Sequence, residues 1–336
     1  MPVRVAVDAM GGDRGPAEIV AGAKEAIASG GVEVVIVGPR GLDTGGLELI
    51  EAPDVIEMDE KPTEAVRAKP ESSLVVACRL VGDGEAAAVV SPGNTGAMLA
   101  ASLLHIRRIK GVLRPAIAVV IPARSGPTVL IDAGANADAR PEHLVQFAQM
   151  GLILSEDVLG VRRPQVRLLS IGEEAEKGNQ LALEAHSLLA GSVEAFAGNT
   201  EGRDLLGLGE QVIVTDGFTG NVTLKVVEGT ITTVLEGFRS EIAASTRGKL
   251  GGLLIRPAAR RLRTRLDPDT YGGAYLLGLR GLAVIAHGNS TSRAIANAIL
   301  LATRGVEHDV VRRLAQRLEP TVLKSGTSTA PTPQTR

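Results

Sequence analysis

The 336-residue sequence has no tryptophan, one cysteine, two tyrosines and four phenylalanines. A single cysteine, Cys78, excludes an internal disulfide and a cysteine-based zinc site. So few aromatic rings argue against a surface that stacks nucleic-acid bases. The net charge of −2 excludes overall charge attraction to nucleic acid. We therefore expect no nucleic-acid partner.

Long apolar runs are also missing, because no stretch approaches the roughly 18 uninterrupted apolar residues of a membrane span. Residues 3–8 (VRVAVD) predict a strand rather than a signal peptide. The common nucleotide-binding, zinc-protease and serine-hydrolase motifs are absent. Cys78 falls in a predicted helix at 72–80, where a core position is favoured over a nucleophile. We expect a cytoplasmic α/β protein.

One pattern recurs along the chain: a short apolar run, a loop rich in Gly, Asn and Asp, and then an amphipathic helix. Strands that alternate with helices predict a parallel sheet covered on both faces. Ligands bind outside the carboxyl ends of such strands, so the loops are expected to converge on one crevice. The predicted strands lie at 3–7, 32–37, 86–90, 128–131, 166–170, 212–214 and 282–286.

Glycine is abundant, with 40 residues, which suggests that the backbone approaches a ligand closely at several points. Five Gly-Asn pairs begin at residues 93, 178, 198, 220 and 288. Loop amides at a helix N-terminus form a natural anion site. The competing interpretation is that each asparagine only caps its helix.

Lys177, beside Gly178 and Asn179, could hold a phosphate and offset developing negative charge. The alternative is a solvated lysine paired with Glu173 or Glu174. No covalent nucleophile stands in these loops, which suits direct attack by bound phosphate.

Acids stand in the same loops, and they are favoured as anchors that orient loop amides rather than as metal ligands. His287, the one histidine in such a loop, is favoured as a structural residue. The acids are Asp8, Asp13, Asp132, Asp138 and Asp216.

Taken together, the loops resemble those of the PlsX-type phosphate acyltransferases of bacterial phospholipid synthesis. One such stretch would be weak evidence, but nine in the expected order over nearly the whole chain are highly specific. The stretches are 8–13 (DAMGGD), 93–97 (GNTGA), 132–136 (DAGAN), 141–151 (PEHLVQFAQMG), 171–179 (IGEEAEKGN), 198–204 (GNTEGRD), 216–221 (DGFTGN), 271–273 (YGG) and 287–290 (HGNS).

The resemblance implies an enzyme that transfers a long-chain fatty acyl group from the thioester of acyl carrier protein to inorganic phosphate. The acyl phosphate would feed phospholipid synthesis, with no metal and no organic cofactor. The implied fold is a three-layer α/β/α fold with a mainly parallel sheet, like that of isocitrate and isopropylmalate dehydrogenases, in a homodimer. We expect this catalytic domain over residues 1–318 and a flexible tail at 319–336.

The resemblance assigns catalysis to Lys177 and Asn221. Lys177 would bind phosphate and stabilise the tetrahedral oxyanion, and Asn221 would orient phosphate or the thioester carbonyl. Further substrate-binding residues are expected at Asp8, Gly11, Gly12, Asp13, Gly93, Asn94, Thr95, Gly96, Asp132, Asn136, Asn179, Asn199, Asp216, Gly220, His287 and Asn289. Departures from the family pattern, which bear on loop shape and acyl-chain preference, occur at Pro92, Leu113, Tyr275 and Asn289.

Residues 242–268 predict a basic amphipathic segment, in which Pro257 divides two short helices. The resemblance implies peripheral membrane association, with apolar side chains in lipid and arginines at the headgroups. The same charge could dock the acidic carrier protein, and the alternative is a solvated, salt-bridged helical pair. The expected docking residues are Arg247, Leu250, Leu253, Leu254, Ile255, Arg256, Arg260 and Arg261.

Three other functions compete with this one. A short-chain enzyme like phosphate acetyltransferase would use acyl-CoA as its donor. A non-enzymatic membrane-binding scaffold built on the basic segment would leave the Gly-Asn loops unexplained. A metal-dependent dehydrogenase would need a nicotinamide fingerprint, which the sequence lacks.

Overall fold

The computed structural model describes residues 2–207, 209, 211–266 and 272–318. The expected tail at 319–336, the end of the basic segment at 267–268 and Tyr271 lie outside the described residues. The strands are β1 (Val3–Asp8), β2 (Val32–Gly38), β3 (Glu48–Glu51), β4 (Ala88–Ser91), β5 (Ala116–Ala123), β6 (Gly126–Ile131), β7 (Gln165–Leu169), β8 (Phe196–Thr200), β9 (Gln211–Val214), β10 (Ala274–Leu277) and β11 (Leu282–Ile285).

Helices follow most of the predicted strands, and Pro16 and Pro141 occupy first turns as the sequence predicts. The helices are α1 (Pro16–Ala28), α2 (Pro62–Ala68), α3 (Ser73–Gly82), α4 (Thr95–His105), α5 (Pro141–Ile153), α6 (Gln180–Ser192), α7 (Gly217–Ala243), α8 (Thr246–Leu266), α9 (Ser292–Glu307) and α10 (Val310–Arg317). Short helical turns also occur at Leu154–Val158 and Gly202–Asp204.

A single eleven-stranded sheet runs through the molecule in the order β3-β2-β1-β4-β11-β10-β5-β6-β9-β7-β8. Pairing is parallel except at the centre, where β10 is antiparallel to both β11 and β5, and β5 forms a hairpin with β6. The mainly parallel α/β sheet is therefore confirmed. The sequence pattern did not predict β3, β5, β8 or β10.

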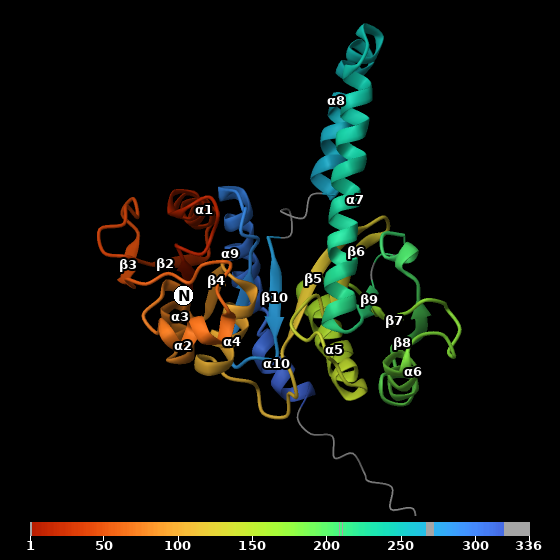
Figure 1. Ribbon diagram of the computed structural model, residues 1–336, viewed down its shortest axis with the longest axis horizontal. Coiled ribbons are helices and arrows are strands. Elements are labelled where there is room, and N and C mark those ends of the chain that lie inside the picture. Colours follow the sequence, from red (N-terminus) through yellow and green to blue (C-terminus); the bar gives the residue numbers. More distant parts are fainter. Residues whose placement is uncertain (1, 208, 210, 267–271, 319–336) are drawn as a thin grey trace, which may run out of the picture.

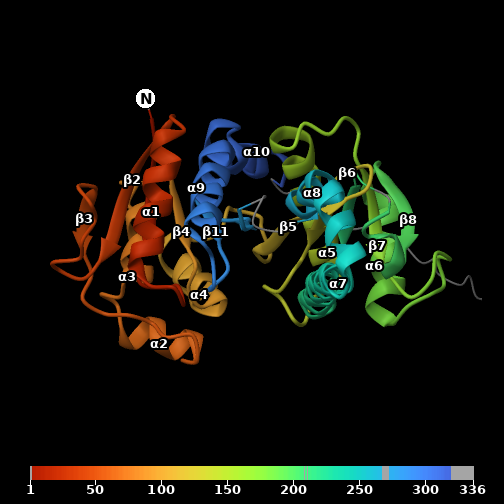
Figure 2. The ribbon, with the colours of Figure 1, turned by 90° about the horizontal axis from the view of Figure 1, so that it is seen from above.

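Helices cover the two faces of this sheet unevenly. Next to β1, β4 and β11, α1 and α9 pack together on one face and α3 and α4 on the other (Figures 1 and 2). Next to β6, β9 and β7, α5 and α6 cover the first face. Within the described residues, the opposite face there carries a small apolar cluster that includes Leu130, Leu205 and Ile213. Leu224 of α7 packs against this cluster, and α7 contacts β6.

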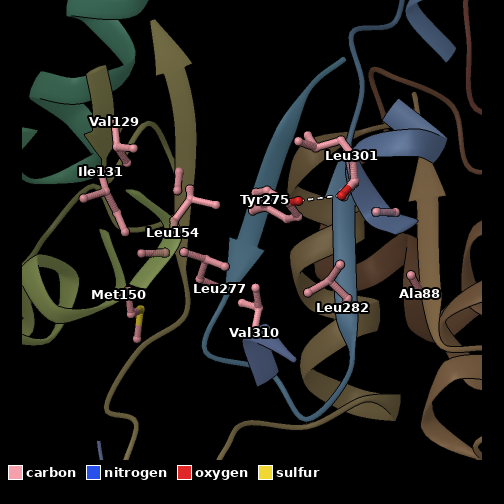
Figure 3. Close-up of a cluster of buried hydrophobic side chains, with 14 of the residues drawn as sticks. Ala88, Val129, Ile131, Met150, Leu154, Tyr275, Leu277, Leu282, Leu301 and Val310 are labelled. Carbon is pink, nitrogen blue, oxygen red and sulfur yellow. Dashed lines mark hydrogen bonds between the residues drawn. The ribbon is translucent and has the colours of Figure 1, made fainter. Parts of the chain in front are cut away.

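Tyr275, one of the departures from the family pattern, lies in the centre of the core. Its ring is 1% exposed, and its hydroxyl donates a hydrogen bond to the carbonyl of Leu301 on α9 (Figure 3). Burial raises the pKa of this hydroxyl above its usual value. Leu113, another departure, is 44% exposed, and its amide donates to Gln146. Neither residue lines the cavities described below.

A helical hairpin of α7 and α8 projects from the body (Figure 1). The expectation of two short helices is wrong, because α8 is one helix that contains Pro257. A proline inside a helix removes one backbone hydrogen bond and crowds the preceding turn. The helix α8 nevertheless continues through Pro257 and packs against α7. A Cβ on Gly248 would lie 2.3 Å from the Ile242 carbonyl oxygen, and one on Gly252 would lie 2.6 Å from the Ile242 side chain. These glycines permit close packing, which supports a continuous α8.

Candidate active site

A cavity of about 430 Å³ opens at the carboxyl ends of β4, β6 and β11, beside α4 and α7. Its size is in the usual range for a small-molecule site. One part is polar and includes residues 93–96, Asn221 and His287. Another part is apolar and includes Val119, Ile121 and Ile231. The cavity can therefore hold a polar reacting group and an apolar chain together.

The β4–α4 loop supplies one polar wall of this cavity. Asn94 caps α4, because its side chain accepts a hydrogen bond from the Ala97 amide at 3.0 Å. The Asn94 amide nitrogen donates to the Met58 carbonyl at 3.0 Å. Asn94 therefore caps its helix, as the competing interpretation of the Gly-Asn pairs held. Thr95 and Gly96, the first residues of α4, line the cavity. The first amides of a helix have no partner within it and can face an anion.

Glycines in these loops let the loops pack closely against one another. From the sequence, the same glycines were expected to let the backbone approach a ligand. A Cβ on Gly11 would lie 2.7 Å from the Cα of Gly93, so the 8–13 and 91–96 loops touch directly. On Gly12 it would lie 3.3 Å from Pro92, a departure from the family pattern. On Gly96 it would lie 2.5 Å from the Pro62 side chain.

The loop after β11 joins this assembly through backbone contacts. The Asp13 amide donates to the Gly288 carbonyl at 2.7 Å. The Arg14 Nε donates to the Asn289 carbonyl at 2.7 Å, and Asn289 is exposed. His287, Gly288 and Ser290 line the cavity.

Asp8 holds these loops from inside the protein and does not line the cavity. It is 1% exposed and accepts hydrogen bonds from the Ser73 hydroxyl at 2.6 Å and the Ser91 hydroxyl at 2.7 Å. The Met10 amide also donates to it, at 3.1 Å. Burial raises the pKa of Asp8, although these hydrogen bonds oppose the shift. Asp8 thus orients these loops, the role that the sequence favours for the loop acids, and its contact with substrate stays a prediction.

Asp132 does the same for the loop after β6. It is fully buried, and one oxygen accepts from the amides of Ile117, Gly134 and Ala135. The other accepts from the backbone amide and the side chain of Asn136, which also donates to the Pro115 carbonyl. Asp132 and Asn136 thus shape the loop, and Gly134 lines the cavity.

A second cavity, of about 310 Å³, lies beside the loops after β7 and β9. Asn179, in its lining, caps α6 by accepting from the Ala182 amide at 2.9 Å. Asp216, also in the lining, caps α7 by accepting from the Thr219 amide at 2.8 Å. Asn199 on β8 is 2% exposed and donates to the Glu174 carbonyl at 2.7 Å, which ties the loop after β7 to β8.

Lys177 belongs to this second group of loops. Its side chain is exposed, and its methylene groups lie against Gly172. Within the described residues its ammonium makes no ion pair, so the pairing with Glu173 or Glu174 is not found. The loops do not line one cavity as expected. Asp216, the N-cap of α7, and Thr219 line the second cavity, Asn221 lines the main one, and Lys177 is in the lining of neither.

Two charged residues of the main cavity were missed from the sequence. Lys225 and Glu228 follow Asn221 on α7 and line the same cavity. Lys225 Nζ lies 2.9 Å from one oxygen of Glu228, and His287 Nε2 lies 3.3 Å from the other. The spacing 221, 225 and 228 places all three on one helix face, which periodicity could have revealed.

Gly220 allows α7 to start against the Asp132 loop, since an added Cβ would lie 1.9 Å from the Asp132 carbonyl oxygen. Gly220→Ala is expected to lower the free energy of unfolding by about 1–3 kcal/mol, because the overlap forces backbone shifts. Gly229→Ala on the same helix has open space and should be stabilising by about 0.5–1 kcal/mol. Urea unfolding of both variants measures this contrast, and equal midpoints would contradict it.

Within the described ranges, no group of three or more His, Cys, Asp or Glu side chains is arranged to hold a metal ion. Cys78 is fully buried, and burial raises the pKa of its thiol to about 12, which agrees with a core role. The helices of the described part include none long and apolar enough to cross a membrane.

Comparison with known proteins places the chain among lipid-synthesis enzymes. The profile of a family described as "Fatty acid synthesis protein" matches residues 3–313. A phosphate acyltransferase from Desulfitobacterium hafniense (strain Y51) is 46% identical over 326 residues, covering 94% of this chain and 97% of that protein. One from Leptospira biflexa is 44% identical over 327 residues, covering 94% and 96%.

Solved structures with the same fold are more distant in sequence. A phosphotransacetylase from Streptococcus pyogenes has a TM-score of 0.61 at 16% identity, covering 91% of this chain and 94% of that one. A branched-chain phosphotransacylase from Enterococcus faecalis V583 has a TM-score of 0.60 at 15% identity, covering 91% and 99%. At this identity the likeness shows the fold alone.

Proposed function

Because the chain belongs to the fatty acid synthesis protein family and is an acyltransferase enzyme that forms acyl phosphate for phospholipid synthesis, we propose that its donor is a long-chain acyl thioester of acyl carrier protein. Its acceptor is inorganic phosphate. We also propose that residues 1–318 form one catalytic unit. Its sheet would be related to that of isocitrate and isopropylmalate dehydrogenases.

The observation that carries the proposal is the division of the main cavity into a polar and an apolar part. The amides at the start of α4 and the Asn221 side chain suit a phosphate and a thioester carbonyl. The apolar part, with Val119, Ile121 and Ile231, suits an alkyl chain. An acetyl group would leave that apolar surface uncovered, so a long acyl group gains more from it.

Chemically, a phosphate oxygen attacks the thioester carbonyl carbon, a C–O bond forms and the C–S bond breaks. The sulfur leaves with the electron pair of the broken bond. Asn221 orients the reacting groups in the main cavity. Lys177 lies outside that cavity's lining, on the loop beside the second cavity, and to stabilise the oxyanion it reaches across the first turn of α7. The exposed ammonium of Lys177 and its loop beside the first turn of α7 support this role.

Donor preference tests the proposal. Palmitoyl carrier protein and acetyl-CoA are each supplied with phosphate, and release of the free thiol is measured. We expect turnover of the palmitoyl carrier and little turnover of acetyl-CoA. The reverse preference would indicate the short-chain enzyme that the fold also supports.

The proposal extends to a membrane surface, which the α7–α8 hairpin would contact. Leu250, Leu253 and Leu254 are 65–79% exposed on α8. Arg247, Arg256 and further basic residues share that helix, which has no acidic residue. Exposed apolar side chains beside arginines suit an anionic lipid surface.

Leu253→Glu combined with Leu254→Glu is expected to weaken binding to anionic vesicles by about 10-fold or more, because two apolar side chains leave lipid and two charges of the wrong sign are added. Vesicle sedimentation measures this. Leu104→Glu, at a site on α4 that is 55% exposed, should bind normally. Activity on carrier protein in solution should persist in both. Unchanged vesicle binding by the double variant would contradict the membrane role, and lost activity would favour a carrier-docking role.

A homodimer is also part of the proposal. Phe218, Val222 and Val226 recur every fourth residue on α7 and are 49–67% exposed. Such a stripe suits a second copy of the chain, because burying it removes apolar surface from water.

A further inference from the structure

His287, Glu228 and Lys225 form a charged group in the wall of the main cavity that the reaction described above does not use. His287 comes from the loop after β11, and the other two come from α7. The His287 side chain is 41% exposed, whereas that of Glu228 is 21% exposed. His287 Nε2 faces Glu228 Oε1 at 3.3 Å, and Lys225 Nζ faces the second oxygen at 2.9 Å.

This geometry fixes the charge of the carboxylate and the orientation of the ring. Burial alone would raise the pKa of Glu228, but hydrogen bonds from His287 and Lys225 outweigh burial and hold it below the usual value. With Nε2 on Glu228, Nδ1 is the ring nitrogen left for a ligand in the cavity that His287 lines.

We propose that His287 is a catalytic residue that protonates the departing carrier thiolate from Nδ1, with Glu228 as the positioning residue that orients the ring through Nε2. This inference rests on the proposed function. When the C–S bond breaks, its electron pair goes to sulfur and the Nδ1 proton follows, which leaves a neutral imidazole held by Glu228. The ring then regains a proton from solvent.

The proton matters because the reaction is otherwise easily reversed. A carrier thiolate left beside a newly formed acyl phosphate is the nucleophile of the back reaction. A thiol with a pKa near 8.5 is mostly protonated at neutral pH, so protonation in the site delivers the stable product. General acids of this kind typically contribute about 10²–10⁴-fold.

Charged groups from α7 and the β1–α1 loop lie around His287. Glu228 and Lys225 face it from α7. Asp13 approaches the neighbouring Gly288 from the β1–α1 loop, and Arg14 binds the Asn289 carbonyl. Replacing Glu228 by glutamine removes the carboxylate that faces Nε2, so the ring loses the partner that orients it in the cavity. Turnover of the carrier donor, whose thiolate needs the proton, should therefore fall.

The test compares two palmitoyl thioesters as donors to phosphate. One is palmitoyl carrier protein and the other is a palmitoyl aryl thioester, whose more acidic thiol leaves without a proton. His287→Gln is expected to lose about 100-fold of turnover with the carrier donor and only a few-fold with the aryl donor. The aryl donor thereby also reports that the variant is folded. His308→Gln, at the exposed C-cap of α9, should match the wild type with both.

Glu228→Gln supplies a second readout, because it should lower turnover of the carrier donor and largely spare the aryl donor. An equal loss of His287→Gln turnover with both donors, or no loss with either, would overturn the inference. So would a Glu228→Gln turnover of the carrier donor equal to that of the wild type. If the wild type itself formed no acyl phosphate from the carrier donor, the proposed function would fail instead.

Discussion

Lys177→Ala is expected to lose about 10²–10³-fold of phosphate-dependent turnover with palmitoyl carrier protein, the effect typical of removing one group that stabilises an oxyanion. Lys177 is exposed on the loop before α6, and its ammonium makes no ion pair within the described residues. Its removal should therefore cost little folding stability, and the free energy of unfolding should stay within about 0.5 kcal/mol of wild type.

Lys110→Ala is the matched control. Lys110 lies beside a separate cavity, near Arg280 and Asp309. Its replacement by alanine removes the same single positive charge as Lys177→Ala. It should leave turnover unchanged, so that a loss in Lys177→Ala cannot be assigned to net charge or to weaker attraction of the acidic carrier. Near-normal turnover of Lys177→Ala would contradict its catalytic role and shift attention to Asn221 and the main cavity.

Asp132→Ala should have the largest effect on stability. The carboxylate accepts hydrogen bonds from four backbone amides and from the Asn136 side chain, all within 3.1 Å. An unpartnered buried donor costs about 1–3 kcal/mol. We expect the free energy of unfolding to fall by about 3 kcal/mol or more, which urea unfolding measures.

Asp138→Ala removes a carboxylate from the same loop region, but Asp138 is exposed. Its unfolding midpoint should stay near that of the wild type, since surface substitutions usually change stability by less than about 0.5 kcal/mol. Equal stability of the two variants would show that the buried hydrogen bonds of Asp132 do not hold this loop.

Much of the fold was predictable because strand and helix signals are local. The helices that begin at Pro16 and Pro141, and the burial of Cys78 in α3, follow from the sequence. The β5–β6 hairpin and β10 were missed because no loop and helix follow β5 or β10, and antiparallel pairing at the centre of the sheet depends on distant partners. Pro257 misled because packing of α8 on α7 outweighs local propensity.

The loops that form the candidate site were predictable from the sequence. Their division between two cavities was not. The strand-end motifs identified residues 93–96, Asn221 and His287, which do share one cavity. The pattern could not show that the first turn of α7 lines a different cavity from Asn221. Nor could it show that His287 lies beside Glu228, because that contact joins two elements far apart in the chain. Asp8 and Asp132, expected among the substrate-binding residues, are buried and hold loops in place.

The central claim is that phosphate itself accepts the acyl group. The most direct measurement supplies palmitoyl carrier protein and isotopically labelled inorganic phosphate to the wild-type enzyme and follows label in the lipid product together with free carrier protein. The account predicts labelled palmitoyl phosphate equal in amount to the carrier released, with no release when phosphate is omitted. Carrier release that gives free palmitate without label, at a rate independent of phosphate, would contradict it.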